Sequence, residues 1–242
     1  MEDLANGFRG YSALTAHGLA LVATKAAVAP FDRWRVLRQV FPSHRNDWVS
    51  LLRKGWIGFI PHASHALLFT SMNLGSLALF EMVGSDYSFA SHLFASSIAT
   101  TLCYPLDVRY TVRTTLAPVS RTFFSGYSLC FVSVPVSVIS SLAALSFLSL
   151  IFPLPDPNAK NIDLARGVAV GSVSALFGSA VVYPIDTIRR RMIYSQCSVV
   201  DAMKSKRLYS GLSIHLFKSI PEFSVLTFAY LANLRYWASS NL

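Results

Sequence analysis

The sequence is short of charged residues, which make up only 14% of its 242 positions. A soluble domain carries about 25% charged residues, so this shortage argues against an ordinary water-soluble protein. Apolar residues make up 53% of the chain, and the mean hydropathy is +0.46. The composition therefore predicts a protein that crosses a membrane several times.

Cysteine is also scarce, and the three cysteines lack the spacing of a disulfide framework or a metal site. Cys103, Cys130 and Cys197 form no CxxC pair, and their odd number argues against a set of disulfides. No Ser/His/Asp set, metal-ligand cluster or glycine-rich phosphate loop stands out in the chain. We therefore expect the cysteines to fill apolar space, and we expect a protein without cofactor or metal that is not an enzyme.

What the chain does contain is a short motif that recurs three times. APFDRWR, YPLDVRY and YPIDTIR each combine proline, aspartate and arginine, and the prolines are 75 and 79 residues apart. The motif residues are Pro30, Asp32 and Arg35; Pro105, Asp107 and Arg109; and Pro184, Asp186 and Arg189. The period predicts one domain, residues 1–242, made of three repeats at about 10–82, 86–152 and 160–238.

Each repeat has two apolar segments, one before and one after a basic stretch. The predicted spans are residues 11–34, 57–80, 88–109, 127–151, 164–188 and 212–237. About 20 residues suffice to cross a bilayer as a helix. Small residues recur every four positions in the first span of each repeat, which favours close helix packing in lipid. They are Ala16, Ala20, Thr24, Ser91, Ala95, Ala99, Cys103, Gly167, Gly171, Ala175 and Ser179.

The basic residues gather in the loops inside the repeats. Residues 35–55, 109–126 and 189–210 hold 14 of the 21 lysines and arginines, against two acids. The positive-inside rule then predicts that these loops share one compartment and that both termini lie in the other. Lys204, Lys206 and Arg207 could hold anionic lipid headgroups, although solvated loop charge explains them equally well.

The three motifs at the ends of the odd-numbered spans resemble those of the mitochondrial carrier family. The resemblance covers roughly residues 10 to 237. It implies an all-α membrane protein with six transmembrane helices in a threefold pseudosymmetric barrel, in the inner membrane of a mitochondrion or a related organelle. It also implies that the prolines kink the odd helices and that each aspartate pairs with the base of the next motif. These pairs would form a gate on the matrix side of a central cavity, where partnered charges are tolerable.

Within the family, the carriers of adenine nucleotides, coenzyme A and ATP-Mg/phosphate are the most similar. TKAAVAPFDRWRVLRQ resembles their first repeat, and GLSIHLFKSIPE resembles a segment of the coenzyme A and ATP-Mg/phosphate carriers. The resemblance implies substrate contacts at Lys25 and Lys218. Arg189 to Met192 resembles the start of the arginine-methionine signature of the ADP/ATP carrier, which adds Arg190 as a further contact.

The predicted function is exchange of a phosphorylated, nucleotide-like anion by alternating access. An adenine nucleotide (ADP/ATP) is the first candidate, and coenzyme A or ATP-Mg/phosphate is the alternative. The expected partners are this substrate, the membrane and an anionic lipid such as cardiolipin, with no nucleic acid. We expect a monomer.

Two departures from the family pattern leave a different function open. Arg109 stands one residue early, which turns its side chain about 100° around the helix, so we expect two matrix-side salt bridges and one compromised pair. The even spans lack outer-gate charges, and Leu231 follows Tyr230 where the family has an acid. His62 and His65 stand where the family has a basic substrate contact, and we interpret them as structural. A membrane scaffold that no longer transports is therefore the alternative.

Overall fold

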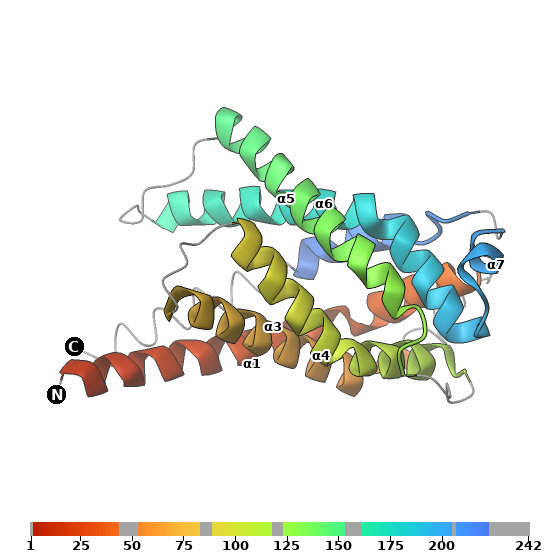
Figure 1. Ribbon diagram of the computed structural model, residues 1–242, viewed down its shortest axis with the longest axis horizontal. Helices are drawn as coiled ribbons and strands as arrows, with labels where there is room; N and C mark the ends of the chain where they lie inside the picture. The colour runs from red at the N-terminus through yellow and green to blue at the C-terminus, as the bar shows by residue number, and fades with distance from the viewer. Residues whose placement is uncertain are drawn as a thin grey trace.

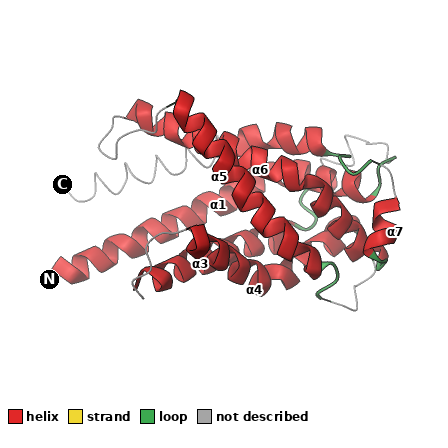
Figure 2. Ribbon diagram, turned by 45° about the horizontal axis from the view of Figure 1, so that its top comes forward, coloured by secondary structure: helices red, strands yellow, loops and turns green. Residues whose placement is uncertain are grey.

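The computed structural model describes residues 2–43, 53–82, 89–117, 123–152, 161–204 and 207–222. In these ranges all the regular structure is helical (Figure 2). The long helices are α1 (Glu2–Val40), α3 (Phe59–Met82), α4 (Phe89–Thr115), α5 (Cys130–Ile151) and α6 (Asn161–Ser195). A 3-10 turn, η1 (Tyr127–Leu129), a short helix, α7 (Val199–Lys204), and a helical stretch at residues 212–222 complete the described part.

The helices form a barrel in chain order. They run roughly along the long axis of the molecule, with α7 at one end (Figure 1). α1 contacts α3, α3 contacts α4, α4 contacts α5, and α5 contacts α6. The stretch 212–222 closes the barrel, because the ring of Phe217 lies 5.8 Å from that of Phe31 in α1, and His215 lies 5.8 Å from Tyr183 in α6. The predicted all-helical fold is confirmed for the described residues.

The outer surface of the barrel is apolar. Within the described residues, Tyr127–Ile151 and Ala169–Ser195 are long and apolar enough to cross a bilayer by length and composition alone. In the first of these, Phe131, Phe147 and Leu150 are 68%, 63% and 83% exposed. Soluble proteins rarely expose so much contiguous apolar surface, so this face fits lipid. The sixth predicted span lies within the described residues only as far as residue 222.

The odd helices continue beyond their prolines, whereas the predicted spans ended close to them. Pro30, Pro105 and Pro184 lie inside α1, α4 and α6. A proline removes one backbone hydrogen bond and clashes with the preceding turn, which can kink a helix without ending it. The residues that follow each proline are polar, so the apolar segment ends near the proline although the helix continues.

The second and third motifs share a contact that fixes the start of the next helix. Gly126 and Gly211 have φ angles of +76° and +89°, a region that residues with a Cβ rarely adopt. The hydroxyls of Tyr104 and Tyr183, which precede the motif prolines, donate to the carbonyl oxygens just before these glycines. Each turn is thereby tied to the kinked helix before it.

Gly178 marks a close approach of α6 to α5, which gives a first prediction. A Cβ at this position would lie 2.8 Å from the carbonyl oxygen of Ser137 and would overlap the side chain of Ser141. We expect Gly178→Ala to lower the free energy of unfolding by about 1–3 kcal/mol, as overpacking does. Gly171→Ala is the matched control, because a Cβ there meets nothing within 4 Å.

Thermal melts of both variants in one detergent measure the difference. Gly171→Ala should be neutral or stabilising by up to about 1 kcal/mol, since alanine favours a helix over glycine. Equal melting temperatures for the two variants would contradict the close α5–α6 contact.

Candidate functional site

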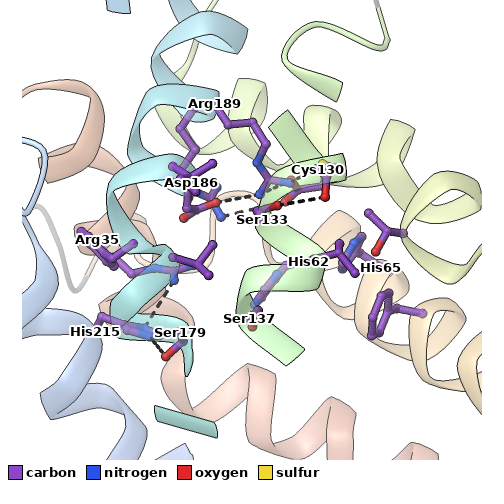
Figure 3. A pocket seen from close by; sticks show the side chains of 18 residues that line it. Arg35, His62, His65, Cys130, Ser133, Ser137, Ser179, Asp186, Arg189 and His215 are labelled. Atoms are coloured by element: carbon purple, nitrogen blue, oxygen red, sulfur yellow. Dashed lines mark hydrogen bonds and ion pairs between the residues drawn. The ribbon is translucent and has the colours of Figure 1, made fainter. Parts of the chain in front are cut away.

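A cavity of about 330 Å³ with charged and polar side chains in its wall lies inside the barrel (Figure 3). All five long helices and the stretch 212–222 contribute to its wall. Its charged lining residues are Arg35, Asp107, Asp186, Arg189 and Arg190, and its other polar ones include His62, His65, His215, Ser133, Ser137 and Ser179. The described residues include no group of three or more His, Cys, Asp or Glu side chains that could hold a metal ion.

Arg189 joins α4 to α6 at this cavity. Its Nη2 lies 2.8 Å from Oδ2 of Asp107 and 2.7 Å from Oδ1 of Asp186. Arg190 adds a bond of 3.0 Å from its Nε to Asp186 and one of 3.0 Å from its Nη1 to the hydroxyl of Thr111. Bonds between ionised groups are the stronger class of hydrogen bond, so the two arginines hold both carboxylates in place.

The expected pair of Asp186 and Arg35 is replaced by another contact. Arg35 lies 3.6 Å from Asp32 in its own helix, and its Nη1 lies 3.4 Å from Nδ1 of His215. Gln39, one turn further along α1, donates to Asp186 at 3.0 Å. At Asp186, α1 therefore contacts α6 through the side-chain amide of Gln39. Two matrix-side salt bridges between helices were expected at the motifs, and the structure forms the one between Asp107 and Arg189.

Asp32 pairs with residues other than Arg109. Its side chain is 2% exposed, and both Nζ of Lys218 and Nε2 of His62 lie 3.1 Å from its carboxylate. Arg109 is exposed, and its guanidinium lies 5.8 Å from the ring centroid of Phe123. The displaced base thus lies on the surface, and a lysine and a histidine from two other helices contact the aspartate.

The two lysines assigned to substrate share a third acid. Nζ of Lys218 lies 2.7 Å from Oε2 of Glu222, and Lys25 pairs with Oε1 of the same carboxylate. Lys25 borders a second cavity of about 230 Å³ next to the first, and Ser179 lines both. With Asp32, these residues form a group of two cations and two anions, which we call the lysine cluster.

The three consecutive arginines of the third motif have two different roles. Arg189 and Arg190 bind the motif acids, whereas Arg191 donates to the backbone carbonyl oxygens of Gln39, Ala202 and Arg207 at 2.9, 3.4 and 3.2 Å. Successive side chains are about 100° apart around a helix, which separates the two sets of contacts. Arg191 thereby ties α6 to the end of α1 and to the segment that contains α7.

Some residues of the site were not predicted from the sequence. The contact of Glu222 with Lys218 could have been predicted, because residues four positions apart meet on one face of a helix. His62 contacts Asp32 in another helix, and both His62 and His65 line the cavity. Their interpretation as structural groups stays a prediction. A histidine in an apolar segment gives no local sign of a partner in another helix.

No family model matches the chain. A mitochondrial thiamine pyrophosphate carrier 1 from Kluyveromyces lactis is 21% identical over 286 aligned positions, which cover 91% of this chain and 89% of that protein. A protein of the same name from Aspergillus niger is 28% identical over 203 positions, covering 69% and 63% respectively. These matches confirm the resemblance carried by the three motifs, because both proteins are mitochondrial carriers and the chain is similar to them at low identity.

Proposed function

We propose that this protein is a solute carrier that moves an anion bearing a pyrophosphate group across the mitochondrial inner membrane. The relationship to mitochondrial carriers places the chain in that membrane as a multi-pass protein. The observation that supports the substrate class is the cavity with Arg35, Arg189 and Arg190 in its wall. Guanidinium groups match phosphate oxygens in geometry and charge.

The charge balance of the site also favours an anion. Five cations, two of them in the lysine cluster, face four carboxylates, which leaves one net positive charge when the histidines are neutral. The cations are Lys25, Arg35, Arg189, Arg190 and Lys218, and the carboxylates are those of Asp32, Asp107, Asp186 and Glu222. The cavity volume lies at the lower end of the range for small-molecule sites, about 300–1,000 Å³.

A pyrophosphate group is common to the nucleotide-like candidates and to thiamine pyrophosphate. ADP, ATP and coenzyme A contain it, and the positions of Lys25 and Arg190 favour a nucleotide. Thiamine pyrophosphate contains it too, and both relatives are named for that compound. We therefore assign the group and not the rest of the molecule.

Transport follows from competition for the same cations. Arg189 binds Asp107 and Asp186 in this structure, which holds α4 and α6 together. A bound phosphate competes with these carboxylates, so that binding energy is spent on opening the pairs and lowers the barrier to rearrangement, as in transition-state binding by enzymes.

The second candidate is a membrane scaffold that does not transport. α5, which would carry part of an outer gate, has no charged residue between Cys130 and Ile151. A carrier without charged pairs at its outer gate would close less firmly on the outer side of the membrane. The retained ion pairs around Arg189 favour transport over this alternative.

Uptake by reconstituted liposomes tests the proposal. Vesicles preloaded with unlabelled compound should take up labelled ADP, ATP, coenzyme A or thiamine pyrophosphate, and not labelled thiamine or inorganic phosphate. Protein-free vesicles and the Arg109→Gln variant, which alters an exposed base, serve as controls. Absence of uptake for the whole panel, together with stable binding of a protein partner, would favour the scaffold.

A further inference from the structure

We propose that anion transport by this protein is coupled to a proton carried by the pair of His62 and Asp32. The inference rests on the proposed function and adds a driving force to it. The proposal rests on the contacts of one histidine inside the barrel.

The geometry fixes where the protons of the pair lie. Nε2 of His62 is 3.1 Å from Oδ2 of Asp32. An ionised carboxylate only accepts hydrogen bonds, so Nε2 carries a hydrogen and donates it. Nδ1 is then the atom that takes up a second proton, and the carboxylate stabilises the imidazolium that results. The side chains of His62 and Asp32 are 14% and 2% exposed. Charges in such a buried site interact more strongly than in water.

Charged and titratable groups face His62 from four neighbouring elements. The ring of Tyr110 in α4 stacks on the imidazole, with 4.4 Å between centroids. The charged groups are Asp32, Lys25 and Arg35 from α1, Lys218 and Glu222 from the stretch 212–222, and Arg190 from α6, which lies over Tyr110. Lys218 and Arg35 lie beside Asp32 and already balance the negative charge of its carboxylate. His62 is therefore neutral in this arrangement.

Anion binding changes that balance. Lys218 is shared between Asp32 and Glu222, at 3.1 and 2.7 Å. A phosphate that engages Lys218 draws it from Asp32, and His62 is then the neighbour that can restore the lost charge by taking up a proton. Coupling between two ligands is reciprocal, so the proton also favours the anion. The proton leaves His62 on the far side, when the anion departs and Lys218 returns to Asp32.

The other histidines of the cavity do not have this arrangement. Nδ1 of His215 faces Nη1 of Arg35 at 3.4 Å, and because arginine only donates, Nδ1 must accept and stay unprotonated. Nε2 of His215 lies 2.9 Å from the hydroxyl of Ser179. His65 stacks on Phe69 at 5.9 Å and, among the described residues, has no carboxylate within ion-pair distance.

The test combines substrate uptake with proton flux. Liposomes containing a trapped pH dye take up labelled ADP or thiamine pyrophosphate at an external pH of about 7, where a phosphate with a second pKa of about 6 is ionised. If one proton accompanies each anion, making the outside one pH unit more acidic than the inside should raise accumulation about tenfold.

Two matched glutamine variants locate the proton. His62→Gln can still donate a hydrogen bond to Asp32 but cannot titrate. Its uptake should fall, because the proton that favours the anion is lost, and the uptake that remains should show neither proton flux nor a gradient response. His65→Gln, one turn away in α3, should keep the proton flux and the gradient response. A gradient response that survives in His62→Gln, or that is lost in His65→Gln instead, would overturn the assignment.

The outcomes separate the coupling from the proposed function. Wild-type uptake that is unaffected by the gradient overturns the coupling alone, whereas no uptake of any pyrophosphate compound removes the proposed function and the coupling with it. Should His62→Gln fail to fold, wild-type protein in weakly buffered detergent gives a second measurement. Addition of ADP or thiamine pyrophosphate should take up about one proton per bound molecule, and no uptake of protons would contradict the proposal.

Discussion

Replacing Lys218 by methionine should abolish uptake of every anion that the wild-type protein carries. Lys218 is 3% exposed, and its Nζ lies between Asp32 and Glu222. Methionine keeps most of the length but removes the charge, so two carboxylates are left with fewer partners in a buried site. Removing one member of a buried ion pair costs about 3–5 kcal/mol, and we expect a loss of stability of that order beside the loss of uptake. Thermal melts and liposome uptake measure the two effects.

A second change separates stability from transport. Lys218→Met combined with Glu222→Gln removes one acid along with the cation and should recover part of the lost melting temperature. Uptake should stay absent in the double variant, because the phosphate has lost its lysine. Lys218→Arg keeps the charge and should keep measurable uptake. Normal uptake by a folded Lys218→Met variant would remove this lysine from the substrate site.

The three motifs show how much of the site the sequence could predict. Their spacing and the apolar segments around them predicted the helices, the family and the positions of Asp32, Asp107 and Asp186 in the odd helices. The same reasoning predicted that Arg109 would be poorly placed, because a shift of one residue rotates a side chain about 100°. These features are local, so the sequence contains them.

The partners of each acid could not be predicted in the same way. Asp32 contacts His62, 30 residues away, and Lys25 contacts Glu222, 197 residues away. Which side chains meet across the barrel depends on the rotation of each helix and on the kinks at the prolines, and neither follows from spacing. Gln39 in place of Arg35 at Asp186 is another result of such a rotation.

The expected effect is also large at Arg189, which the structure places between two acids of different helices. Its Nη2 contacts Asp107 at 2.8 Å and Asp186 at 2.7 Å. If Arg189 becomes glutamine, Asp186 keeps Arg190 and Gln39 at 3.0 Å each, whereas the nearest cation to Asp107 is then Arg190, at 3.9 Å. We therefore expect α4 and α6 to separate more easily, with the change concentrated at Asp107.

Uptake should fall at least tenfold in Arg189→Gln, because a hydrogen bond to a charged group contributes about 1.5–3 kcal/mol. Cys130 offers an independent readout, since its sulfur lies 3.6 Å from Nη1 of Arg189 and the residue is only 4% exposed. In a background with Cys103→Ala and Cys197→Ser, loss of Arg189 should make Cys130 react faster with a water-soluble maleimide. Arg109→Gln is the control, because this exposed base contacts no motif acid among the described residues, and it should resemble the wild type in both measurements. If the two arginine variants behave alike, Arg189 does not hold the cavity closed, and the ion pairs at the motifs serve stability alone.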